Sequence, residues 1–88
     1  MTEKTFKIIE KFGIHARPAA QLVSKAGQYG AEIALQYKEK SINLKSIMGI
    51  MALGVPSGAE VTIVAEGNDA KEALEALEEL IKSEGIGQ

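Results

Sequence analysis

The chain has 88 residues, of which 45% are hydrophobic and 25% charged, with a formal net charge of -2 and no cysteine. This length accommodates a single domain, residues 1–88, with one modest core, and the lack of cysteine excludes disulfides and thiolate metal sites. The slightly acidic balance argues against direct binding of nucleic acid. The charged N-terminus resembles neither a secretory signal nor a membrane span, so we expect a cytoplasmic protein that does not insert into membranes.

Hydrophobic periodicity predicts seven elements in the order βαββαβα. Apolar residues alternate with polar ones in four predicted strands: Thr5–Glu10, Glu32–Tyr37, Ser41–Leu44 and Glu60–Ala65. Apolar residues recur at helical spacing in three predicted helices: Pro18–Gln28, Ser46–Leu53 and Ala70–Ile81. Around the last helix, Glu78 and Lys82 form an i,i+4 pair, and Asp69 with Glu72 resembles a capping box.

These elements predict an α+β fold in which one sheet carries its helices on one face, because that arrangement buries the apolar side of every element. The sheet should be mainly antiparallel, since the second and third strands are joined by too few residues for a crossover. Periodicity leaves the order of the strands open, and a ferredoxin-like arrangement shares the first six elements.

The segment GIHARPAA contains the only histidine of the chain, His15, at the predicted start of the first helix. If that helix begins at Ala16, His15 is its N-cap, Pro18 lies in the first turn, and the backbone N–H groups of Ala16 and Arg17 are free. Arg17 then stands at the positive end of the helix dipole, at a cost of about 0.3–1 kcal/mol that reverses when an anion binds there. An imidazole can attack a phosphoryl group and later act as its leaving group. The segment therefore predicts a phosphate site around a histidine nucleophile.

Each residue of this segment, taken alone, is most simply a capping or solvated side chain. Only the combination of these residues indicates a reactive site. A metal site is disfavoured, because one histidine without cysteine would need carboxylate partners and none lies close to His15 in the sequence. No GxSxG elbow is present, and so small a domain offers little room for a substrate pocket.

The segment KSIMGIMALG predicts a second functional helix. Ser46 is placed as its N-cap, a position at which a phosphate would be favoured by the helix dipole. The helix is apolar on nearly every side, so one small sheet cannot cover it all. We expect Ile50 and Leu53 in the core. We expect some of Ile47, Met48 and Met51 to be exposed, and an exposed apolar patch often marks a partner surface.

GIHARPAA and LKSIMGIMALG, in this order and at this separation, closely resemble the two signature segments of the HPr family. These are the histidine-containing phosphocarriers of the bacterial phosphoenolpyruvate-dependent sugar phosphotransferase system. GAEVTIVAEG and EALEALEELIKSEG likewise resemble the last strand and last helix of the family. The resemblance implies an open-faced β-sandwich: a four-stranded antiparallel sheet in the order 1-4-2-3, covered on one face by three helices.

The resemblance also implies roles for individual residues. His15 matches the histidine that accepts a phosphoryl group on Nδ1 from Enzyme I and passes it to EIIA domains, and Arg17 matches the arginine that stabilises the phosphohistidine. Ser46 matches the serine modified by HPr kinase/phosphorylase, whose phosphorylated form acts with a catabolite control repressor. Ile47, Met48 and Met51 match the apolar docking patch that these partners share. Such a carrier is a monomer without cofactor or metal and is not a stand-alone enzyme.

Two other functions stay open from the sequence. One is a regulatory binding module that acts through phospho-Ser46 as a co-repressor in carbon catabolite repression; the family's paralogue Crh lacks the histidine that this chain keeps. The other is a small enzyme of ferredoxin-like topology, which would need a concave polar pocket. The sequence also departs from the family in the turn after Tyr37, which lacks glycine. We expect strain at Lys38 or Glu39, and a neutral or stabilising effect of Glu39→Gly.

Overall fold

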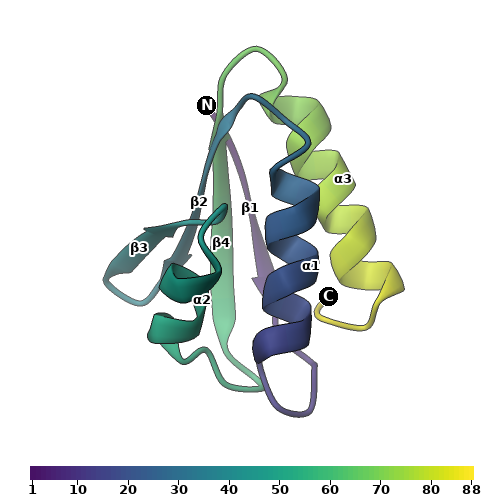
Figure 1. Cartoon of the computed structure of the whole chain (residues 1–88). Helices are drawn as coiled ribbons and strands as arrows, with labels where there is room; N and C mark the ends of the chain where they lie inside the picture. The colour runs from purple at the N-terminus through teal and green to yellow at the C-terminus, as the bar shows by residue number, and fades with distance from the viewer.

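The computed structural model describes all 88 residues, and seven elements follow one another in the predicted order. The strands are β1 (Thr2–Lys7), β2 (Glu32–Tyr37), β3 (Lys40–Asn43) and β4 (Glu60–Glu66). The helices are α1 (Ala16–Ala26), α2 (Ile47–Leu53) and α3 (Ala70–Ser83). All three helices lie on one side of the sheet (Figure 1), and none of them is long and apolar enough to cross a membrane.

The four strands form one antiparallel sheet in the order β1-β4-β2-β3. The expected strand order and open-faced architecture are therefore confirmed, and the ferredoxin-like alternative is excluded. Alternation sets the register: Phe6 of β1 stands opposite Val61 of β4, and both face the helices, while Thr5 and Thr62 face solvent and share a hydroxyl hydrogen bond of 2.9 Å.

The core is a single cluster of 22 buried hydrophobic residues between the sheet and the helices. Strand β4, in the interior of the sheet, contributes Val61, Ile63 and Ala65 at every second position. Helix α3 contributes residues three and four positions apart, among them Ala73 and Leu77, which are fully buried. No polar or charged side chain is buried, so every functional group of the protein lies at or near its surface.

The first strand begins three residues earlier than predicted and ends at Lys7. Phe6 and Ile8 are both buried, as the alternation indicated, but Ile8 pairs in an isolated bridge with Gly87 near the C-terminus. The C-terminal segment therefore pairs with the end of β1 on the side away from β4, where Lys7 exchanges two backbone hydrogen bonds with Gln88, while Ile8 still bonds to Gly58 and Ala59 just before β4. Smaller shifts move β3 to Lys40–Asn43. Pairing partners far away in the sequence decide these boundaries.

The predicted capping box at α3 is wrong. Asp69 occupies the N-cap position, but its side chain makes no bond to the helix. Its two carboxylate oxygens instead accept hydrogen bonds of 2.8 Å from the backbone N–H groups of Gly30 and Ala31, just before β2. A carboxylate that bridges two amides of another segment gains two charge-assisted bonds, whereas a cap offers one. Asp69 thus ties the start of α3 to the start of β2.

The hairpin between β2 and β3 contains the expected backbone strain, but at one residue only. Lys38 has a φ of 56° and is the only non-glycine residue with positive φ, while Glu39 has an ordinary backbone conformation. The predicted effect of Glu39→Gly therefore rests on the wrong residue. In the four-residue turn from Tyr37 to Lys40, the residue with positive φ is the first of the two central residues, Lys38, and not the second, Glu39.

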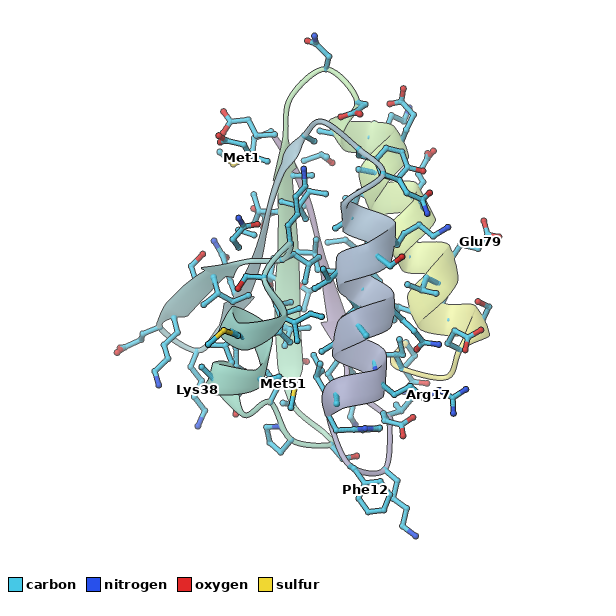
Figure 2. The ribbon with its side chains drawn as sticks, viewed as in Figure 1. Met1, Phe12, Arg17, Lys38, Met51 and Glu79 are labelled. Carbon is cyan, nitrogen blue, oxygen red and sulfur yellow. The ribbon has the colours of Figure 1, made fainter.

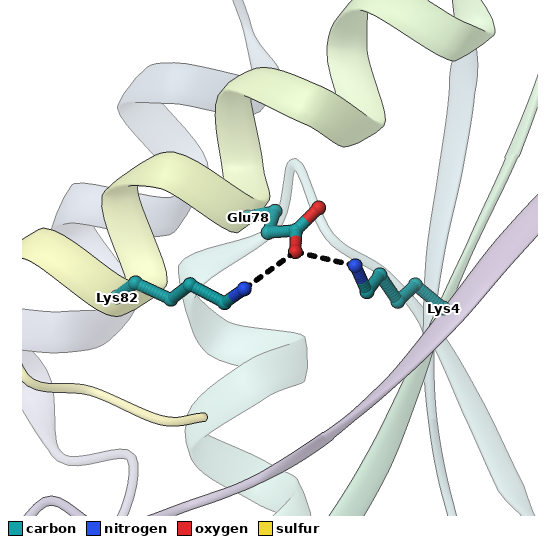
Figure 3. Close-up of polar contacts among 3 residues, drawn as sticks. All are labelled: Lys4, Glu78 and Lys82. Carbon is teal, nitrogen blue, oxygen red and sulfur yellow. Dashed lines mark hydrogen bonds and ion pairs between the residues drawn. The ribbon is translucent and has the colours of Figure 1, made fainter.

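An ion cluster joins the edge strand β1 to α3 (Figure 3). Glu78 Oε2 accepts a hydrogen bond from Lys4 Nζ and a second, of 2.8 Å, from Lys82 Nζ. The bond from Lys4, supported by that from Lys82, holds the pKa of Glu78 below its ordinary value. The predicted pair of Glu78 and Lys82 is thus confirmed, and a lysine from the sheet completes it.

Candidate functional site

The loop between β1 and α1 is fixed by backbone hydrogen bonds to two distant segments. The N–H groups of Ile9 and Glu10 donate to the carbonyl of Ile86 at 2.9 and 3.2 Å. The N–H of Ile14 donates to the carbonyl of Val55, in the loop after α2, at 3.0 Å. This loop therefore has a defined position relative to both the C-terminal segment and the end of α2.

Gly13 makes this arrangement sterically possible. It has a φ of 71°, which residues with a Cβ rarely adopt, and a Cβ atom built there would stand 2.2 Å from the carbonyl oxygen of Val55. Its N–H donates to the carbonyl of Glu10 at 2.9 Å and closes a tight turn. The turn delivers the chain to the start of α1.

His15 is the N-cap of α1, as predicted, in extended backbone conformation with φ -88° and ψ -169°. Its carbonyl accepts the first helical bond, from Ala19 N–H at 3.0 Å. The N–H groups of Ala16 and Arg17 donate to no acceptor, His15 gives them no side-chain cap, and Pro18 has no N–H. Two free amides therefore stand at the positive end of an eleven-residue helix, as a phosphate site requires.

The two ring nitrogens of His15 have different surroundings. Nε2 lies 3.2 Å from Glu10 Oε1, and Nδ1 makes no hydrogen bond. Because an ionised carboxylate only accepts, Nε2 carries the proton and donates it, which leaves the lone pair of the neutral ring on Nδ1. The side chain is 36% exposed, so a reactant can reach this nitrogen. The sequence analysis found no carboxylate close to His15 along the chain, but the turn closed by Gly13 brings Glu10, five residues earlier, back to the ring.

A small hollow of about 130 Å³ surrounds the ring. Its wall is formed by Glu10, His15, Arg17, Pro18, Gln21, Glu84 and Ile86. The Gln21 amide donates to Glu84 at 3.0 Å, while the Arg17 side chain makes no hydrogen bond or ion pair and extends outward from the start of α1 (Figure 2). Larger hollows over β2 and β3 and beside their hairpin contain no imidazole. The hollow at His15 has room for a phosphoryl group but is well below the usual size of a small-molecule site.

Ser46 and the apolar patch lie on α2 as the sequence predicted. Ser46 Oγ accepts a hydrogen bond of 3.0 Å from Gly49 N–H, which makes this residue a true N-cap. Ile50 and Leu53 are buried. The three other side chains are exposed, by 44% at Ile47, 83% at Met48 and 43% at Met51.

Phe12 is a surface residue that the sequence analysis did not single out. It is 70% exposed, and its ring meets the imidazole of His15 edge to face, with centroids 6.0 Å apart and planes at 86°. Figure 2 shows Phe12, Arg17 and Met51 at the same end of the molecule. A large aromatic residue in a polar loop, directly before the glycine of a histidine motif, is the signal that could have identified it.

The fold thus places an accessible imidazole at a helix N-terminus, beside a helix with exposed apolar side chains. Residues 2–83 match the family described as the PTS HPr component phosphorylation site. The chain belongs to this HPr family.

Several solved structures agree with this assignment. The histidine-containing phosphocarrier protein of Mycoplasma is 38% identical, with 99% of each chain covered and a TM-score of 0.96. HPr-C-His from Thermoanaerobacter tengcongensis is 48% identical over 94% of this chain and 93% of that one, with a TM-score of 0.90. The catabolite repression protein Crh of Bacillus subtilis, whose crystal structure is a dimer with a swapped domain, is 40% identical over 98% and 99%, with a TM-score of 0.75.

Proposed function

We propose that this protein accepts a phosphoryl group from phospho-Enzyme I on Nδ1 of His15 and donates it to sugar-specific EIIA domains. The observation that carries this proposal is the placement of the ring: Nε2 lies 3.2 Å from the Glu10 carboxylate, and Nδ1 makes no hydrogen bond and lies at an exposed helix N-terminus. A capping or merely solvated histidine requires neither feature.

The transfer is a displacement at phosphorus. The Nδ1 lone pair forms a bond to phosphorus while the bond between phosphorus and the donor's leaving group breaks, and Nε2 keeps its proton throughout. The two free amides of Ala16 and Arg17 and the Arg17 guanidinium, which has no partner in the protein, supply positive charge beside the bound group. Donation to the next protein reverses this step, with the imidazole as leaving group.

The docking patch of Ile47, Met48 and Met51 supplies a common surface for successive partners. Exposed methionines repack easily against surfaces of different shape, which suits a carrier that visits several proteins. Phe12 extends the apolar surface toward the phosphoryl acceptor. Because one face serves each partner in turn, the protein acts as a monomeric carrier, and the partner enzymes supply the remaining catalytic groups.

A second function, regulation through phosphorylation of Ser46, is favoured by the position of that residue. Its hydroxyl caps α2 directly beside the docking patch, where an added phosphate changes the charge of the docking surface. The similarity to Crh supports this function as well. We place it beside phosphoryl transfer and not in its stead, because His15 and its site are intact in this chain.

Purified protein incubated with Enzyme I and phosphoenolpyruvate should gain one acid-labile phosphoryl group, measured by intact mass before and after acid treatment. His15→Ala should gain none, whereas Ser46→Ala should be labelled like the wild type. Equal labelling of the His15→Ala protein would refute the assignment.

A further inference from the structure

The carboxylate of Glu10 lies beside the His15 ring, where it can stabilise the positive charge that the ring gains during phosphoryl transfer. During transfer the imidazole becomes positively charged, because Nδ1 gives its lone pair to phosphorus while Nε2 still holds a proton. A carboxylate at Nε2 stabilises such a cation, as the aspartate does for the imidazolium of a serine protease triad. Glu10 Oε1, at 3.2 Å from Nε2, is the only hydrogen-bond partner of the ring.

The backbone of Glu10 holds this carboxylate in place. Its N–H donates to the carbonyl of Ile86 at 3.2 Å, and its own carbonyl accepts from Gly13 N–H at 2.9 Å. Ile86 is 1% exposed and belongs to the core. The backbone of Glu10 is thus held by hydrogen bonds on both its N–H and its carbonyl. Its side chain is 29% exposed, so the pair with His15 is partly shielded from solvent.

We propose that Glu10 is a positioning residue for phosphoryl transfer: it holds the proton on Nε2, which directs the phosphoryl group to Nδ1, and it stabilises the cationic ring while the new bond forms. This inference rests on the proposed function of His15. Glu10 should stabilise the ring both when it accepts the phosphoryl group and when it donates it, because the ring carries positive charge in both steps.

Variants at Glu10 separate its two contributions. Glu10→Ala removes both the acceptor and the charge, and we expect transfer from Enzyme I to slow about fivefold, which corresponds to about 1 kcal/mol at the upper end for a partly exposed pair. Glu10→Gln keeps an acceptor for Nε2–H but carries no charge. Its rate of transfer from Enzyme I should therefore lie between those of the wild type and Glu10→Ala. ¹⁵N NMR of the neutral ring should show more Nδ1-protonated tautomer in Glu10→Ala than in the wild type or Glu10→Gln.

Glu75→Gln is the matched control, because it removes one carboxylate from the exposed face of α3, outside the hollow that His15 lines. If only the loss of one negative charge mattered, Glu75→Gln and Glu10→Gln would change the transfer rate equally. The proposal requires instead that Glu10→Gln is slower than the wild type and that Glu75→Gln matches the wild type. Unfolding curves establish that each variant is folded at the assay temperature.

The results distinguish this proposal from the function on which it rests. If the wild type accepts no phosphoryl group on His15, the proposed function fails, and the role of Glu10 falls with it. If the wild type is labelled on His15 and Glu10→Ala is labelled at the same rate with the same ring tautomer, the role of Glu10 alone is overturned.

Discussion

Replacing Gly13 by alanine tests the close contact between the histidine loop and the loop after α2. A φ of 71° costs a residue with a Cβ about 1–2 kcal/mol. The new methyl group would also stand 2.2 Å from the Val55 carbonyl oxygen and 2.9 Å from Pro56 Cα, so the backbone must shift, which adds about 1–3 kcal/mol. The sum of about 2–5 kcal/mol is a large part of the stability of a domain this size, about 4–13 kcal/mol.

Urea unfolding followed by circular dichroism measures this loss, with Gly85→Ala as the control. Gly85 has a nearly identical φ of 68°, but nothing lies within 4 Å of a Cβ built there. Its substitution should therefore cost only the backbone term of about 1–2 kcal/mol. The excess loss in Gly13→Ala measures the steric term. Equal losses in the two variants would mean that the Val55 loop moves aside freely, and the argument for a fixed relation between the two loops would be refuted.

Three further outcomes are expected. Lys38→Gly should raise the unfolding free energy by about 1 kcal/mol in urea titrations, since glycine adopts the positive φ without strain, whereas Glu39→Gly should not; a stabilised Glu39→Gly would contradict this. Glu78→Gln should lower Tm at neutral pH. Because the folded state depresses the pKa of Glu78, its contribution is present above the unfolded pKa and is lost as pH falls through the folded pKa. The difference in Tm from the wild type should therefore shrink as the pH falls below the ordinary pKa of a glutamate; a constant difference would argue against the ion cluster. Ser46→Asp should keep the fold but slow transfer from Enzyme I several-fold in a stopped-flow assay, because a charge beside the docking patch is poorly solvated in the complex; unchanged kinetics would count against this docking surface.

The features predicted correctly from the sequence depend on local rules. His15 and Ser46 were placed as N-caps because a proline or an apolar run follows each of them at the right distance, and both occupy those positions. Exposure of some of Ile47, Met48 and Met51 was predicted because one sheet cannot cover a two-turn helix that is apolar on nearly every side, and all three are exposed. The strand order came from family resemblance alone, because periodicity carries no information on which strands are neighbours.

The features that the sequence did not predict depend on partners far along the chain. Asp69 satisfies the local pattern of a capping box, yet its carboxylate bonds to Gly30 and Ala31, which only the folded sheet brings near. Glu10 was overlooked for a related reason. It lies only five residues before His15, but its position depends on a turn that requires positive φ at Gly13 and an anchor at Ile86. Pattern rules rank nearby interactions and cannot weigh these against tertiary ones.

In the proposed function, the same long-range contacts place phosphoryl transfer and partner docking on one rigid surface. The chain leaves the patch on α2, passes Gly54, and reaches Val55, whose carbonyl accepts a hydrogen bond from Ile14, the residue before His15. Val55 and Ile14 are both buried, so this bond is shielded from water. The distance between the patch and His15 is therefore set by backbone hydrogen bonds and not by flexible side chains, so a partner bound to the patch would contact His15 in a fixed geometry. Orienting the reactants in this way lowers the entropic part of the transfer barrier, which is the contribution that a carrier without a pocket of its own can make.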